Sequence, residues 1–143
     1  MIFLDTNVVS ETLKPSPDPL VIDWLIAHDA ELALPAVALA ELAYGIERVR
    51  PHNRAKRLAR GLVAWRDRLK GRIFSFGEAA AMHYGELMGE AARNGLPMSI
   101  PDGMIAATAR VHAASLATRN VADFRDTELD LINPWIAPGV QER

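Results

Sequence analysis

The stretch Ile2-Phe3-Leu4-Asp5-Thr6-Asn7 places a carboxylate directly after a short apolar run. Such a run, closed by polar turn-forming residues, predicts a buried β-strand that ends at Asp5. Taken alone, Asp5 is equally well explained as a turn residue that caps the following segment. Its meaning therefore depends on what the rest of the chain brings to the end of this strand.

Strands and helices alternate along the rest of the chain. Further strands are predicted at 31–34, 72–76, 115–118 and 129–132, and helical segments at 19–28, 35–50, 53–70, 78–94 and 101–114. This alternation predicts an α/β fold of three layers, with a central parallel β-sheet of about five strands flanked by helices. At 143 residues and 50% hydrophobic content, one domain spanning 1–143 is expected.

The ends of the predicted strands carry polar side chains. In open parallel sheets, ligands bind beyond the carboxyl ends of the strands, where the strand order reverses. Asp5 follows the first strand, and Asn120 and Asp123 follow the strand at 115–118. Loop Asn and Asp are also common turn formers, so Asp123 alone is weighed evenly between the two explanations. If these two strands are neighbours, their acids converge.

Glu41 is the one charged residue in the apolar segment 35–45. At 100° per residue it points away from a core stripe containing Leu39 and Ile46, on a face shared with Val37 and Tyr44. A solvent-facing helix acid is the simpler explanation. However, burying a carboxylate on this apolar face would require a cation or strong donors, which favours a functional role.

Asp102 stands at the start of the predicted helix at 101–114. The helix dipole alone is a sufficient reason for an acid in a first turn. Asp102 nevertheless shares a stripe with Ile105, Ala106 and Ala109, whose small side chains suit a helix packed closely against the sheet. We therefore expect Asp102 to point inward, toward the strand ends.

Together these acids indicate a site for a hard divalent cation, because all-oxygen ligands suit Mg²⁺ or Mn²⁺. Other catalytic devices find little support. The chain has no cysteine, and its four histidines do not form a His-Glu-x-x-His arrangement. No glycine-rich phosphate loop follows a strand, so nucleotide binding of the Rossmann or P-loop kind is not indicated.

Charge is distributed unevenly along the chain. Residues 48–72 contain ten basic residues and one acid, although the net charge of the chain is -2. Arg48, Arg54, Arg57 and Arg60 are candidates for contact with RNA or with an acidic partner segment. The alternative, that these are the solvated faces of two helices, is equally consistent with the composition.

Four segments carry a family resemblance. They are Leu4-Asp5-Thr6-Asn7, the helix around Glu41, Asp102-x-x-Ile105-Ala106-Ala107-Thr108-Ala109, and Thr118-Arg119-Asn120-x-x-Asp123-Phe124. In order and spacing they resemble the motifs of PIN-domain ribonucleases, and the nearest branch looks like the VapC/FitB toxins. That branch often also has a closing Asn-Pro-Trp, as at Asn133-Pro134-Trp135. The resemblance spans nearly the whole chain.

The resemblance implies an Mg²⁺- or Mn²⁺-dependent endoribonuclease with a PIN-like fold, the toxin of a type II toxin-antitoxin system. Such an enzyme hydrolyses RNA phosphodiester bonds by a metal-activated water and leaves a 5′-phosphate and a 3′-hydroxyl. Its implied partners are RNA and a cognate VapB-like antitoxin. A homodimer is expected, and a heterotetramer or larger assembly with the antitoxin.

The resemblance also assigns roles by position. Asp5, Glu41 and Asp102 match the three core acids, while relatives differ over whether the fourth stands at the site of Asn120 or of Asp123. We expect Asp5 and Asp102 to bind the metal, Glu41 to hold it or its waters, and Asp123 to complete the shell. Residues expected to orient these groups are Thr6, Asn7, Thr118 and Asn120.

Three other interpretations remain. A phosphohydrolase could use Asp5 as a covalent nucleophile, but such enzymes usually have a second Asp where Asn7 stands. A PIN-like scaffold could bind RNA or a protein without cleaving, and a solitary nuclease could process RNA without an antitoxin. For location, the acid at position 5, the absence of a long apolar run and the absence of cysteine favour the cytoplasm over secretion or a membrane.

Overall fold

The computed structural model describes residues 1–140. Its strands are β1 (Ile2–Leu4), β2 (Leu32–Pro35), β3 (Ile73–Phe74), β4 (Ser115–Ala117) and β5 (Leu131–Ile132). Its α-helices are α1 (Thr6–Thr12), α2 (Pro19–Ala27), α3 (Ala36–Arg48), α4 (Asn53–Arg68), α5 (Glu78–Arg93) and α6 (Ile100–Val111), with 3₁₀ helices η1 (Asp29–Glu31) and η2 (Val121–Thr127). Within residues 1–140, no helix combines the length and the apolar character needed to cross a bilayer.

The five strands form one parallel sheet with the order β3-β2-β1-β4-β5. β1 lies in the middle, and its residues Phe3 and Leu4 are fully buried. A continuous apolar run is what a strand covered on both faces requires. Phe3 pairs with Ala33 of β2 and with Leu116 of β4. The strand order therefore reverses between β1 and β4, and the predicted neighbourhood of these two strands is confirmed.

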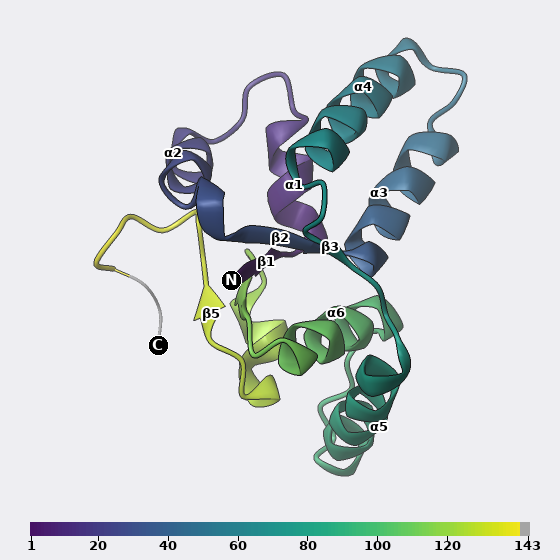
Figure 1. Ribbon diagram of the computed structural model, residues 1–143, viewed down its shortest axis with the longest axis vertical. Coiled ribbons are helices and arrows are strands. Elements are labelled where there is room, and N and C mark those ends of the chain that lie inside the picture. The colour runs from purple at the N-terminus through teal and green to yellow at the C-terminus, as the bar shows by residue number, and fades with distance from the viewer. Residues whose placement is uncertain (141–143) are drawn as a thin grey trace.

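Helices cover the sheet on both faces, as Figure 1 shows. α1 to α4 lie on one side, and α3 and α4 form a pair that projects away from the sheet. α5 and α6 lie on the other side. The predicted three-layer α/β arrangement is confirmed.

Three short elements, α1, η1 and η2, were absent from the sequence prediction. α1 has seven residues and η2 has seven, and both occupy stretches that were expected to be turns or loops. α1 is too short to show a clear helical period, and Pro15 and Pro17 follow it closely. It nevertheless buries Val8, Val9 and Glu11. Asp123 consequently lies on a 3₁₀ helix rather than in an open loop.

α5 and α6 are closely packed at Gly103. A Cβ atom at this position would lie 2.5 Å from Sδ of Met88 and 3.1 Å from Cε2 of Tyr84. Small residues continue along the inner face of α6, where Ala106 and Ala109 are fully buried. The small side chains thus bring the first turn of α6, with Asp102, close to the sheet.

Candidate active site

Asp5 is fixed by its position between β1 and α1. It is the N-cap residue of α1, and its Oδ1 accepts a hydrogen bond of 2.8 Å from the backbone N–H of Thr6. Its Oδ2 accepts hydrogen bonds from the Thr118 hydroxyl at 2.7 Å and from the Asn7 amide at 3.3 Å. Asp5 is only 4% exposed, so its carboxylate has one orientation, set from both β1 and β4.

Burial raises the pKa of the Asp5 carboxyl to about 6. The donors Thr118 and Thr6 act in the opposite direction, while the negative charges of Asp102 and Glu41 add to the effect of burial. Desolvation and like charges both disfavour the ionised form of a carboxyl group. A positive charge beside Asp5 would therefore be strongly favoured.

Glu41 is tied to the same strand end. The hydroxyl of Thr6 donates a hydrogen bond of 2.7 Å to Oε1 of Glu41. Of the predicted core stripe of α3, Ile46 is buried and Leu39 is half-buried, and Ala38 and Leu42 complete the buried face. Glu41 is half-buried beside this stripe rather than fully turned to solvent.

Asp102 lies in the first turn of α6, whose N-cap is Ser99. The Ser99 hydroxyl accepts a hydrogen bond of 3.3 Å from the backbone N–H of Asp102. Burial raises the pKa of the Asp102 carboxyl, and the negative charges of Asp123 and Glu41 raise it further. Asp102 is half-buried, and the charges of two other acids reach it. This position agrees with the inward orientation predicted from the sequence.

Asp5, Glu41 and Asp102 line one cavity of about 370 Å³. They come from the end of β1, from α3 and from α6, which are distant in the sequence. The other residues lining this acidic cavity are Thr6, Asn7, Ser10, Glu11, Lys14, Arg119, Asn120 and Trp135. Three of the predicted acids are thus brought together, with Thr6, Asn7 and Asn120 beside them.

The donor set of this cavity suits a hard divalent cation. Carboxylate, hydroxyl and amide oxygens are the ligands of Mg²⁺ and Mn²⁺. Burial, and to a smaller extent the neighbouring acids, raises the pKa of Asp5 and of Asp102. Within residues 1–140, no three His, Cys, Asp or Glu side chains form a group that could hold a metal ion by themselves.

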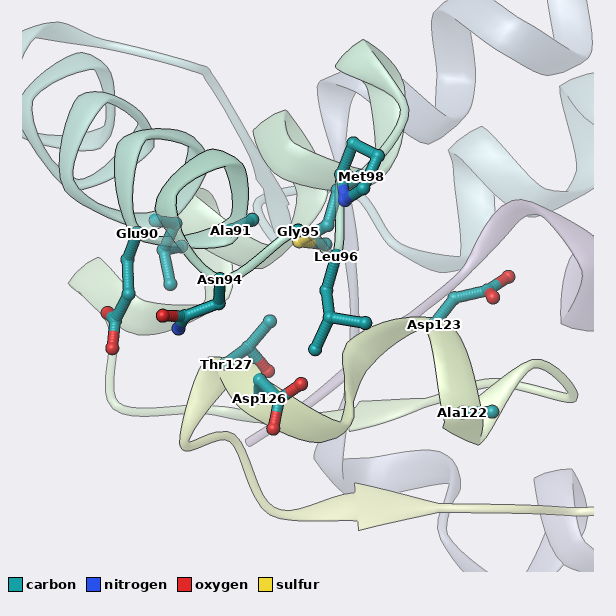
Figure 2. A pocket seen from close by; sticks show the side chains of 12 residues that line it. Glu90, Ala91, Asn94, Gly95, Leu96, Met98, Ala122, Asp123, Asp126 and Thr127 are labelled. Atoms are coloured by element: carbon teal, nitrogen blue, oxygen red, sulfur yellow. The ribbon is translucent and has the colours of Figure 1, made fainter.

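Asp123 lies outside the acidic cavity. It is exposed and lines a second pocket of about 290 Å³ between η2 and the segment that joins α5 to α6. Figure 2 shows its carboxylate pointing away from Asp126 and Thr127 in that pocket. Its charge nevertheless reaches Asp102. Asn120 lines the acidic cavity, and its backbone N–H donates to the Thr118 hydroxyl at 3.0 Å.

None of the four candidate arginines lines the acidic cavity. Arg48 and Arg54 lie near the end of the α3–α4 pair that is farthest from the sheet (Figure 1). Arg57 donates to the backbone carbonyl of Leu13, and Arg48 lies over the Tyr44 ring at 5.8 Å. Contact between these arginines and RNA or an antitoxin stays a prediction.

The sequence prediction missed five residues of the acidic cavity: Ser10, Glu11, Lys14, Arg119 and Trp135. Glu11 and Lys14 belong to α1 and its end, which the periodicity did not reveal. The one available signal was the spacing of Asn7, Ser10 and Glu11 at i, i+3 and i+4, which places them on one face once a helix starts at Thr6. Arg119 and Trp135 lay within motifs that were noted without a role.

Comparison with known proteins gives a consistent result over nearly the whole chain. Residues 2–128 match the family described as PIN domain. "VapC ribonuclease Y4jK" from Sinorhizobium fredii is 38% identical over 138 residues, which cover 94% of this chain and 98% of that protein. "Toxin FitB" from Neisseria gonorrhoeae is 35% identical over 145 residues, covering 94% of this chain and 99% of the toxin.

Solved structures agree with these matches. The crystal structure of FitAcB from Neisseria gonorrhoeae superposes with a TM-score of 0.88 at 34% sequence identity. The superposition covers 96% of this chain and 100% of the other. The sheet, the helical layers and the elements that carry the acids therefore match a known architecture from end to end.

Proposed function

Because this chain belongs to the PIN-domain family, we infer that it is an endoribonuclease and the toxin of a type II toxin-antitoxin pair. One observation carries this conclusion: Asp5, Glu41 and Asp102, which come from three separate elements, line a single cavity. The full-length similarity to a protein named as a VapC ribonuclease and to one named as a toxin supports it. We also propose that residues 1–143 form one PIN domain; residues 141–143 lie outside the described part.

We propose that catalysis depends on Mg²⁺ or Mn²⁺ held by Asp5 and Asp102. Glu41 would hold the cation or its waters, and Asn120 or Asp123 would complete the set. When bound, such a cation lowers the pKa of an attacking water and neutralises charge on the phosphate.

The chain's own residues hold these groups in place. Thr118 and Thr6 fix both oxygens of the Asp5 carboxylate, and Thr6 also donates to Glu41. One threonine therefore couples the orientation of two acids that are 36 residues apart in the sequence. Loss of such outer hydrogen bonds typically reduces metal affinity or activity by 10- to 100-fold.

The protein partner is a cognate antitoxin of the VapB type. This proposal rests on family membership and on the toxin named among the relatives. We also propose a homodimer, and a heterotetramer or larger assembly with the antitoxin. Light scattering of the chain alone and after co-expression with a short upstream reading frame would measure both assemblies.

The test of the proposed activity is cleavage of a mixed tRNA and rRNA pool by partner-free protein in Mg²⁺ or Mn²⁺. We expect discrete cuts that disappear in EDTA and in the Asp5→Asn and Asp102→Asn variants. Asp23→Asn is the matched control, because Asp23 is an exposed acid on α2 outside the cavity. This control should cleave like the unmodified chain.

Two results would contradict the proposal. Equal cleavage in EDTA would remove metal dependence. No cleavage together with no Mn²⁺ binding in calorimetry would remove the catalytic role and favour a binding scaffold.

A further inference from the structure

Besides its acids, the acidic cavity contains two cationic side chains, Lys14 and Arg119. Lys14 is already paired, because its Nζ lies 2.9 Å from Oε1 of Glu11. Within the part of the chain that the structure describes, no carboxylate pairs with the Arg119 guanidinium. This group instead lies over the ring of Trp135, 5.2 Å from the ring centre.

Two hydrogen bonds fix the position of Trp135. Its indole Nε1–H donates to Oε1 of Glu11 at 3.3 Å, and its backbone N–H donates to Oδ1 of Asn133 at 2.9 Å. Glu11 is a buried acid, only 5% exposed, and it also accepts from Lys14 and from the backbone N–H of Asp18. The ring under Arg119 is therefore anchored to a buried residue of α1.

The backbone of Arg119 is linked to Asp5 through Asn7. Its N–H donates to Oδ1 of Asn7 at 3.3 Å, and the Asn7 amide donates to Oδ2 of Asp5 at 3.3 Å. Both the backbone and the side chain of Arg119 are thus placed relative to Asp5. Exposed arginines without such contacts carry far more rotamer freedom.

We propose that Arg119, supported by Trp135 and Glu11, binds a phosphate of the RNA backbone and directs it to the acids. This inference rests on the proposed ribonuclease function. A polyanion is repelled by Asp5, Glu41 and Asp102, and a cationic side chain that these acids do not neutralise would offset this repulsion in addition to the proposed metal ion. A planar guanidinium can stack on an aromatic ring and still offer a fork of donors to a phosphate.

Arg119 is then a substrate-binding residue, and Trp135 and Glu11 are positioning residues. The cation–π contact with Trp135 restricts the position of the guanidinium, and the exposed Arg119 side chain remains open to a ligand. Lysine at this position would retain the charge but would lose both the stacking and the two-point recognition. These differences define the variants that test the inference.

The first test compares the chain with Arg119→Ala, Arg119→Lys and Arg93→Ala. Arg93 is an exposed arginine at the end of α5, outside the acidic cavity, and serves as the matched control. Cleavage of a labelled single-stranded RNA is measured at increasing RNA concentration and at several salt concentrations. Arg119→Ala should raise the half-saturating RNA concentration about tenfold, with a change in the saturating rate under about threefold.

The salt dependence of half-saturation gives a second readout. Each lost phosphate contact with single-stranded RNA should reduce the slope against log salt by about 0.7. Arg119→Lys should recover part of the affinity, and Arg93→Ala should match the unmodified chain. A purely structural role for Arg119 would change the melting temperature without changing this slope.

Trp135 is tested by a double-mutant cycle. Trp135→Leu should raise the half-saturating RNA concentration nearly as much as Arg119→Ala does. The double variant should raise it little more than either single variant. Trp135→Phe keeps an aromatic face without the N–H donor. Its half-saturating RNA concentration should therefore lie between those of the unmodified chain and Trp135→Leu. It also replaces Trp135→Leu if that variant does not fold.

The outcomes separate this inference from the proposed function. If the unmodified chain cleaves RNA while Arg119→Ala keeps its half-saturation and salt slope, the phosphate-binding role is wrong and the ribonuclease stands. Full additivity of Arg119→Ala and Trp135→Leu would remove the positioning role. If the unmodified chain neither cleaves nor binds RNA, the proposed function fails and the inference fails with it.

Discussion

Asp5 is a buried carboxylate whose hydrogen-bond donors do not offset the loss of solvent. Its pKa is raised from 3.8 to about 6. The folded chain therefore binds more protons than the unfolded chain between these two values. By linkage, the free energy of unfolding falls as the pH rises across this window, by about 3 kcal/mol for a shift of this size.

This shift predicts the pH dependence of the metal-free protein. In EDTA, urea denaturation should show stability decreasing between about pH 4 and pH 6, and the Asp5→Asn variant should lose most of that decrease. Asp102 titrates in the same direction and Glu11 in the opposite one, so the informative quantity is the difference between the two proteins. Parallel profiles for the chain and for Asp5→Asn would contradict the assignment.

Asp123 and Asn120 differ in how they can reach a cation. Asn120 lines the acidic cavity, whereas Asp123 is exposed outside it. Calorimetric titration with Mn²⁺ should show at least a tenfold loss of affinity in Asp102→Ala. Asp123→Ala should lose less than about threefold, because its influence is that of a distant charge. An equal loss in both variants would place Asp123 among the ligands.

At the scale of elements, the long helices were predicted from their helical periodicity and the short strands from their apolar runs. Strands β1 and β4 and helices α3 and α6 were located. Parallel-sheet geometry predicted that Asp5 would meet Asn120 and Asp123; Asn120 lines the cavity with Asp5, whereas Asp123 lies outside it. α1 was not predicted, because two helical turns contain too few residues to show a helical period. Its partners in space escaped for a different reason, since the Trp135–Glu11 hydrogen bond joins residues 124 apart.

The contact between α5 and α6 sets the place of Asp102. Gly103→Ala would push against Met88, which is flexible, and against the Tyr84 ring, which packs edge-on against Phe76 with ring centres 5.9 Å apart. The cost of overpacking should exceed the gain in helix propensity, leaving a loss of about 1 kcal/mol. Cleavage should fall as well, because Asp102 is the adjacent residue.

Gly85→Ala is the matched control for this prediction. Gly85 lies in the interior of α5 with nothing within 4 Å of its added Cβ. There the gain in helix propensity is unopposed, so stability should rise by up to about 1 kcal/mol. Chemical denaturation of both variants gives the comparison, and the same sign of change in both would contradict the packing argument.

The whole molecule is electrically divided between an acidic cavity and a basic helical pair. Arg48, Arg54 and Arg60 are exposed on α3 and α4. This helical pair projects away from the sheet (Figure 1). The Arg57 guanidinium is already hydrogen-bonded within the protein, because it donates to the carbonyl of Leu13. A long RNA that reaches the acids could contact this pair with phosphates far from the cut.

This arrangement predicts that the basic pair affects long RNA only. Replacing Arg48, Arg54 and Arg60 by alanine should weaken binding of tRNA and reduce its salt slope by up to about 0.9 for each lost contact with duplex regions. Cleavage of a short single-stranded RNA should be unchanged. An unaltered salt slope with tRNA would remove RNA contact and leave the antitoxin as the candidate partner.

The central place of β1 has a consequence for the order in which the site can appear during synthesis. The Asp5 carboxylate is oriented by Thr118, which lies 113 residues later in the chain, and the ring beside Arg119 comes from position 135. A ribosome that makes this chain has translated most of it before the acids can be held together. Chains that end before β4 therefore lack the Thr118 donor and Arg119 and are unable to assemble the complete cavity.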